Sequence, residues 1–230
     1  MKRNVNLLQF ILVLGIYFGI YINLLPICIR NITLLIDPSA SSANPLIAYL
    51  FDCFILIALI FVLYREYRYG FMEMIKDWKK TILIMIFGVF VLFITNFITG
   101  ILATLLSGSL NSVNQSMIEE STQIAPIYMF FSVAIFAPIV EEGVFRGTIQ
   151  NVLAYKLPKW LAIIISALVF GMLHLIAGLT LGNLKELFFI LPYMGLGIIL
   201  GIFYDKYSIS RTILIHSLYN LISFLMIFNR

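Results

Sequence analysis

Three clusters of polar residues interrupt the apolar stretches of this sequence, and their side chains are of the types that carry out acid–base chemistry. The clusters consist of Glu141, Glu142 and Arg146, of Phe170 and His174, and of His216 and Asn220. Carboxylates and imidazoles can transfer protons during a reaction, and imidazole and amide N–H groups can stabilise an oxyanion. His174 and His216 are also the only histidines in the chain. We therefore expect the chemistry of this protein to lie where the three clusters meet.

Helical spacing separates the roles of the two glutamates. Glu142 and Arg146 are four positions apart, so on a helix they share one face and can form an ion pair. Glu141 points about 100° away around the helix, and the residue four positions further on is not basic. We therefore predict that Glu141 is a general base and that the Glu142–Arg146 pair is structural. A network in which all three charges only join helices is the alternative.

His216 and Asn220 are also four positions apart, so their side chains share a helix face and can donate to a single oxygen. One histidine on a membrane helix is more often a hydrogen-bond partner between helices. Two histidines near a pair of glutamates favour a functional role.

The composition excludes a soluble globular domain. Of the 230 residues, 62% are apolar and 11% are charged, and the mean hydropathy is +1.04. Soluble proteins carry about 25% charged residues. The net charge of +4 is explained by basic residues on the cytoplasmic side of a membrane, and we expect no nucleic-acid partner. Cys28 and Cys53 are too far apart for a CxxC site, and we expect them to be unpaired thiols.

Seven apolar runs are long enough to cross roughly 30 Å of hydrocarbon, which takes about 20 helical residues. They are Val5–Ile29, Leu46–Tyr64, Thr81–Leu106, Ala125–Tyr155, Trp160–Leu179, Leu187–Tyr204 and Ile209–Phe228. We predict an all-α polytopic membrane protein with seven transmembrane helices, six and eight being the alternatives. The helices form one membrane domain, in which residues 1–124 supply N-terminal helices and residues 125–230 a catalytic core.

The basic residues predict the orientation of these helices in the cell membrane. With a cytoplasmic N-terminus, eleven basic residues fall on the cytoplasmic side and three on the other side, as the positive-inside rule requires. The eleven are Lys2, Arg3, Arg65, Arg68, Lys76, Lys79, Lys80, Lys156, Lys159, Lys206 and Arg211, and the three are Arg30, Lys185 and Arg230. The connection from Arg65 to Lys80 is predicted to be a cytoplasmic loop, and the one from Ser107 to Gln123 an external loop.

Charged groups inside a bilayer cost about 2.5–3.5 kcal/mol on insertion scales, so they indicate function. For Asp52, near the external end of its span, we expect only a buried hydrogen bond. Pro138 is expected to kink its span, and a proline whose lost hydrogen bond is replaced by neighbouring groups is the alternative. Two GxxxG pairs are expected to allow close helix contact, and these are Gly143 with Gly147 and Gly197 with Gly201.

The three clusters resemble the motifs of the CPBP family of intramembrane proteases, also called the Abi family, which includes type II CAAX prenyl endopeptidases and bacteriocin-processing enzymes. The EExxxR motif matches Glu141, Glu142 and Arg146, FxxxH matches Phe170 and His174, and HxxxN matches His216 and Asn220. The resemblance covers roughly Ala125 to Phe224. The small size and short loops are similar to those of a bacterial member.

The resemblance implies an intramembrane endopeptidase that cleaves a peptide or membrane-protein substrate in the lipid bilayer, in peptide or bacteriocin processing or in self-immunity. In such an enzyme, Glu141 and His174 would activate a water molecule. His216 and Asn220 would stabilise the oxyanion. The supporting residues would be Glu142, Arg146 and Phe170.

The resemblance leaves the cofactor open, because the family is described both as glutamate-dependent proteases and as metalloproteases. Two histidines, a carboxylate and a water molecule are a common zinc site. Glu141, His174 and His216 would form that set. Asn220 is a poor zinc ligand but a good hydrogen-bond donor, so we favour a site that requires no cofactor, with zinc as the alternative.

Two other classes of function are compatible with parts of the sequence. A non-catalytic membrane scaffold or immunity protein would use the same helices for binding. A proton-coupled transporter would use the glutamates and histidines as a relay, but the repeated halves typical of transporters are not found in the sequence.

Overall fold

The computed structural model describes residues 5–229, and Lys2, Arg3 and Arg230 lie outside that range. The regular structure of the described residues is helical, and no strand occurs among them. Seven helices in this range are long and apolar enough to cross a membrane. This finding confirms the all-α fold and the predicted number of spans, and the protein is a multi-pass membrane protein.

The first three spans are built as follows: the first is α1 (Leu7–Leu14), the π-helix η1 (Gly15–Leu24) and α2 (Leu25–Ile36), the second is α3 (Pro45–Val62), and the third is α5 (Trp78–Ser107). The fourth span is α7 (Pro126–Phe131), the π-helix η2 (Ser132–Phe136), α8 (Ala137–Glu141), the π-helix η3 (Glu142–Gln150) and α9 (Asn151–Leu153). The last three are α10 (Lys159–Thr180), then the 3₁₀-helix η4 (Leu184–Phe189) with α11 (Ile190–Lys206), and α12 (Ile209–Phe228).

Two further helices occupy segments that the sequence predicted to be loops, and in this respect the prediction was wrong. They are α4 (Tyr64–Lys76) and α6 (Val113–Ile124). The Ser112 hydroxyl accepts a hydrogen bond from the Gln115 amide at 3.1 Å and so caps the first turn of α6. Helix α4 is anchored by tertiary contacts, because Tyr204 donates to its Glu66 at 2.9 Å. Local capping and long-range packing thus order both connections.

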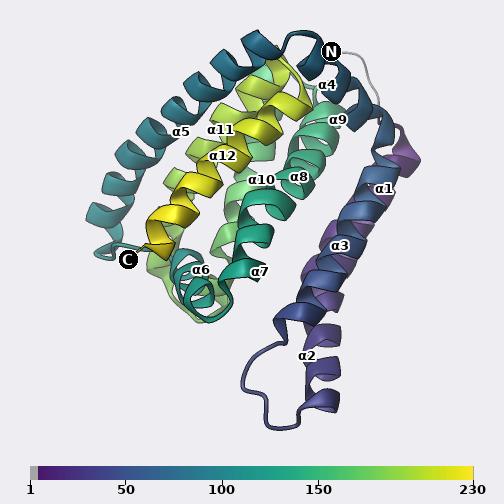
Figure 1. Cartoon of the computed structure of the whole chain (residues 1–230). Coiled ribbons are helices and arrows are strands. Elements are labelled where there is room, and N and C mark those ends of the chain that lie inside the picture. Colours follow the sequence, from purple (N-terminus) through teal and green to yellow (C-terminus); the bar gives the residue numbers. More distant parts are fainter. Residues whose placement is uncertain (1–4, 230) are drawn as a thin grey trace.

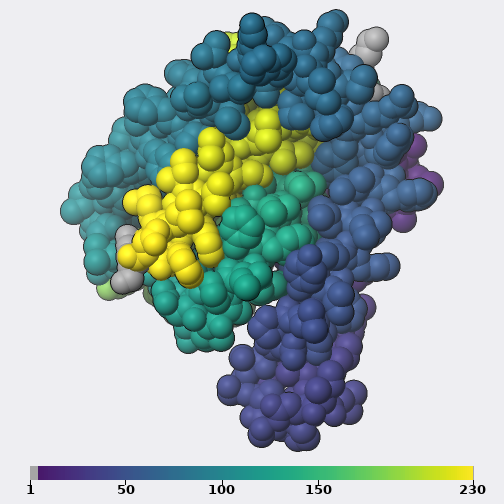
Figure 2. All heavy atoms as spheres, viewed as in Figure 1, coloured from purple at the N-terminus to yellow at the C-terminus, as the bar shows by residue number. Residues whose placement is uncertain are grey.

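The spans form a bundle with an arm beside it. In Figure 1, α5 packs on α11 and α12, and the fourth span lies between α12 and the first two spans. Figure 2 shows that the end of these first two spans, around α2, extends beyond the other helices. Two buried apolar clusters hold the parts together. One joins Leu59 of α3 to Phe136 and Phe145 of the fourth span, and the other joins Leu92 of α5 to Leu200 and Ile215.

The connections that carry most of the basic residues meet at one end of the bundle. Lys159 at the start of α10 forms an ion pair with Asp205 of α11 at 3.0 Å. Arg211 at the start of α12 donates to the Glu73 carbonyl of α4 at 3.2 Å. Helix α6 lies at the opposite end (Figure 1). The structure therefore separates the two groups of connections, and the cytoplasmic location of the basic end stays a prediction.

Close contact between α10 and α11 depends on Gly197. A Cβ atom at this position would lie 2.9 Å from the Cβ and 3.0 Å from the Cα of Ala167. The absence of a side chain also leaves the Gly197 carbonyl accessible to the fourth span, where Arg146 uses it as an acceptor. The predicted role of this glycine in close packing is confirmed.

Candidate active site

The fourth span changes its helical form where the two glutamates lie. Glu141 is the last residue of α8, and Glu142 is the first residue of the π-helix η3. Pro138 is the second residue of α8, directly after the π-helix η2. Proline has no N–H to donate, and π-type turns change which residues share a face. These irregular turns set the directions in which Glu141 and Glu142 point.

Glu142 lies on the packed side of this span. Its side chain is 0% exposed, and its Oε1 lies 2.9 Å from an Arg146 guanidinium nitrogen. Arg146 also donates to the Gly197 carbonyl at 3.1 Å, and its Cζ lies 4.9 Å from the centre of the Phe170 ring. The ion pair predicted from spacing is confirmed, and it is buried between the fourth, fifth and sixth spans.

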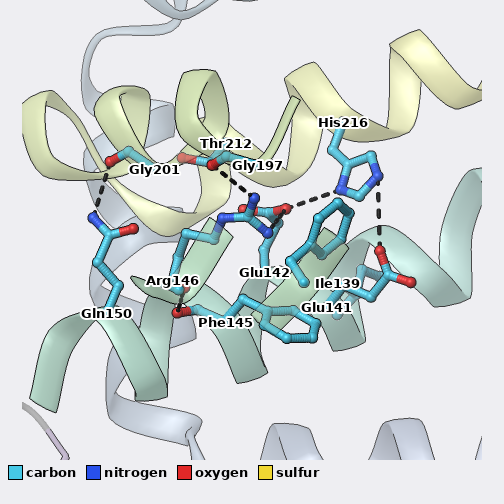
Figure 3. Close-up of polar contacts among 12 residues, drawn as sticks. Ile139, Glu141, Glu142, Phe145, Arg146, Gln150, Gly197, Gly201, Thr212 and His216 are labelled. Atoms are coloured by element: carbon cyan, nitrogen blue, oxygen red, sulfur yellow. Dashed lines mark hydrogen bonds and ion pairs between the residues drawn. The ribbon is translucent and has the colours of Figure 1, made fainter. Parts of the chain in front are cut away.

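His216 lies between the two glutamates, as Figure 3 shows. Its Nδ1 lies 2.9 Å from Glu142 Oε1, and its Nε2 lies 3.9 Å from Glu141 Oε2. A carboxylate only accepts hydrogen bonds, so Glu142 holds a proton on Nδ1 and turns Nε2 toward Glu141. This contact was not predicted, because the spacing in the sequence indicates only Arg146 as a partner of Glu142.

His174 is held by its own helix and by neighbouring rings. Its Nδ1 lies 2.8 Å from the Phe170 carbonyl, which makes Nδ1 the donor and leaves Nε2 as an acceptor. The imidazole stacks on Tyr193 with ring centres 4.5 Å apart and an angle of 24° between the planes. The ionic contact of Glu141 is with His216. A direct role of His174 in orienting Glu141 therefore stays a prediction.

Phe170 connects the three motifs by packing. Its ring centre lies 4.5 Å from that of His174 and 6.4 Å from that of His216, and the Arg146 guanidinium covers its face. Because it is 3% exposed, this ring excludes water from the Glu142–Arg146 pair.

Asn220 donates a hydrogen bond from Nδ2 to the Val133 carbonyl at 2.8 Å. An amide nitrogen carries two N–H groups, and this bond uses one of them. Val133 belongs to η2, where a π-type turn alters the usual helical bonding. Asn220 therefore joins α12 to the fourth span and keeps one donor for another partner.

A cavity of about 500 Å³ brings together the four residues that the sequence predicted to be catalytic. Its walls include Glu141, His174, His216 and Asn220, whereas Glu142 and Arg146 are not among them. Apolar residues of α5, α11 and α12 form much of the wall, and residues of α6 with polar side chains, such as Asn114 and Gln115, form one end. The cavity thus has space for a chain segment beside an ionisable cluster.

The residues present do not form a ready metal centre. Among residues 5–229, no three His, Cys, Asp or Glu side chains come close enough together to hold a metal ion. Nδ1 of His216 is bonded to Glu142 and Nδ1 of His174 to a backbone carbonyl, so Nε2 is the ring atom that each histidine has left for another partner. The cavity therefore offers acid–base and hydrogen-bonding groups of the protein rather than a set of metal ligands.

Fold and site together define a multi-pass helical membrane protein. Among its last five spans lies a cavity that is lined in part by ionisable side chains. Residues 123–222 match the sequence model of the family described as Type II CAAX prenyl endopeptidase Rce1-like. This match confirms the resemblance indicated by the three motifs. It covers nearly the same segment, which was placed at roughly Ala125 to Phe224.

A curated relative matches more distantly. The UPF0177 protein YvdC of Lactococcus lactis subsp. lactis (strain IL1403) is 30% identical over 137 residues, which are 59% of this chain and 49% of the relative. The chain thus spans about half the length of the curated relative that it matches. No solved structure matches the chain.

Proposed function

We propose that this protein is an intramembrane endopeptidase that hydrolyses a peptide bond of a peptide or membrane-protein substrate. One observation carries the proposal: Glu141, His174, His216 and Asn220 come from three different spans and line one cavity. The match of residues 123–222 to a peptidase family supports the same class of reaction. Processing of a peptide or bacteriocin, or self-immunity, is the biological role that we attach to it.

Glu141 acts as the general base in this scheme. It takes a proton from a water molecule while the water oxygen attacks the carbonyl carbon of the scissile bond. His174 holds this water, because its Nε2 is left as an acceptor by the bond from Nδ1 to the Phe170 carbonyl. When the tetrahedral intermediate collapses, the C–N bond breaks and Glu141 returns the proton to the leaving amine.

His216 and Asn220 stabilise the oxyanion. When Glu141 takes up the proton, negative charge moves from its carboxylate to the substrate oxygen. His216 Nε2 faces Glu141 at 3.9 Å. Because Nδ1–H is bonded to Glu142, Nε2 donates to the oxyanion only in the imidazolium form, with a proton on both ring nitrogens. The second N–H of Asn220 is the other donor, and donors fixed before the reaction stabilise the transition state most.

Glu142 and Arg146 position His216. The buried carboxylate binds Nδ1 of the ring, and Arg146 balances the charge of that carboxylate. This arrangement resembles the way in which a buried acid orients a catalytic histidine in hydrolases. The pair therefore acts on the reaction through His216, without lining the cavity.

The test is the variant Glu141→Gln, which keeps the size of the side chain and removes the base. We expect the loss of all turnover with an unchanged thermal unfolding midpoint. Peptides in membranes and medium are compared between cells that produce the wild type and cells that produce the variant. Peptides whose amounts differ between the two kinds of cell are then incubated with the purified wild type and with the purified variant.

Glu120→Gln is the matched control, because Glu120 is an exposed residue of α6 outside the cavity wall. It should process the same peptides at the wild-type rate. Cleavage by purified Glu141→Gln protein at the wild-type rate would refute the role of Glu141 as the base.

A further inference from the structure

Three consecutive residues at the start of α6 are clamped by the sixth span. Ser112 Oγ lies 2.7 Å from the Tyr193 hydroxyl, and Asn114 Nδ2 donates to the same hydroxyl at 3.2 Å. Between them, the Val113 amide donates to Glu186 Oε1 at 2.9 Å. Glu186 is 1% exposed. Tyr193 is thus the first clamp and Glu186 the second clamp on α6, the helix that forms one end of the cavity.

Tyr193 has a second contact on its other side. Its ring stacks on the imidazole of His174, and the Phe170 ring packs against the same imidazole with centres 4.5 Å apart. His174 is therefore held between two aromatic rings, one of which is bonded to α6 through its hydroxyl. A single side chain thus contacts both the end wall of the cavity and a residue of the proposed reaction.

We propose that Tyr193 is a positioning residue that couples the docking of α6 to the placement of His174 in the cavity. When α6 is docked, the hydroxyl of Tyr193 is fixed and its ring holds the imidazole. When α6 detaches, the cavity opens to a substrate and the ring loses its anchor. This inference rests on the proposed function only in giving His174 a role in activating water.

Gly178 provides an independent way to move the same helix. A Cβ atom at Gly178 would overlap the Glu186 side chain, so Gly178→Ala forces Glu186 to shift away from the Val113 amide. This change loosens the second clamp while leaving Tyr193 and His174 intact.

The first measurement follows the detachment of α6 in the purified full-length protein. Cys28 and Cys53 are replaced by serine, and Thr122→Cys provides one thiol at a position of α6 that is 0% exposed. We expect Gly178→Ala, which disturbs one hydrogen bond, to raise the maleimide labelling rate about two- to tenfold. Tyr193→Phe and Ser112→Ala each remove two hydrogen bonds and should raise it further. The matched control is Tyr204→Phe, which removes a buried hydroxyl from the same helix α11 at the end bonded to Glu66. It should leave the labelling rate unchanged.

The second measurement follows His174 itself. Because the chain has only two histidines, imidazole ¹⁵N labelling gives two sets of NMR signals, and His216→Gln assigns them. We expect Ser112→Ala to shift the His174 signals although Ser112 acts on His174 only through Tyr193. In a Tyr193→Leu background the same change should have no further effect, since the coupling residue is gone.

The outcomes separate this inference from the proposed function. Faster labelling with unchanged His174 signals in Ser112→Ala would refute the coupling, as would unchanged labelling in both Tyr193→Phe and Ser112→Ala. Neither measurement requires cleavage, so the coupling is tested even if no peptide proves to be a substrate of this protein. With a cleaved peptide at hand, Tyr193→Phe should lower kcat rather than raise KM, because His174 acts on water.

Discussion

Glu141 and Glu142 are neighbours in the chain, but they lie on two different faces of the fourth span. The side chain of Glu141 is 15% exposed and lines the cavity, whereas that of Glu142 is 0% exposed and is bonded to Arg146. His216 contacts both. The comparison shows how one turn of helix can supply a carboxylate that water reaches and a second carboxylate that only fixes a histidine.

The largest expected effect is on stability, and it arises when the buried carboxylate of Glu142 loses the charge that pairs with it. Arg146→Gln removes the partner of the buried Glu142 and should lower the free energy of unfolding by about 3–5 kcal/mol. Thermal unfolding of the purified protein measures the loss. The double variant Glu142→Gln with Arg146→Met removes both charges and should recover most of the stability but not the activity. A double variant as unstable as Arg146→Gln would show that the loss does not come from the unpaired charge of Glu142.

On the cavity face we expect a loss of rate with little loss of folding. Asn220→Ala removes one oxyanion donor and should reduce turnover by about 10²–10³. Its bond to the Val133 carbonyl is lost as well, which costs about 1 kcal/mol of stability. Peptide cleavage and membrane abundance are measured together. Unchanged cleavage at unchanged abundance would refute the role of Asn220 as an oxyanion donor.

A polar residue that does not line the cavity should have a small effect. Asp52, in the second span, accepts a hydrogen bond from Tyr128 at 3.1 Å, as expected from its position. Asn can accept the same bond, so Asp52→Asn should change the free energy of unfolding by less than about 1 kcal/mol and leave cleavage intact. If cleavage stopped while the protein stayed folded, or if Asp52→Asn abolished proton flux in vesicles, the second span would belong to the site.

The smallest expected effect is that of metal removal. The described residues do not gather three metal-binding side chains. We therefore expect chelation to leave peptide cleavage unchanged. Stoichiometric zinc in the purified protein, with activity lost on its removal and restored on its return, would contradict the scheme and assign Glu141 to the metal.

Many features follow from local sequence and were predictable. Apolar runs of sufficient length define spans, because a helix satisfies its own backbone hydrogen bonds in lipid. The four-residue spacing of Glu142 and Arg146 was enough to predict their ion pair. The helix α6 was missed, although Ser112 followed three residues later by Gln115 resembles an N-terminal capping sequence.

The sequence by itself therefore determined the membrane class and the seven spans, and it indicated the residues that we propose carry the chemistry. Only the tertiary structure decided which of them meet. His216 and Glu142 are 74 positions apart, and Tyr193 and Ser112 are 81 positions apart. Helical periodicity relates residues within a turn or two of one helix, whereas these contacts depend on how separate spans pack. Packing against Gly197 and the π-type turns of the fourth span are what place one glutamate in the cavity and the other behind it.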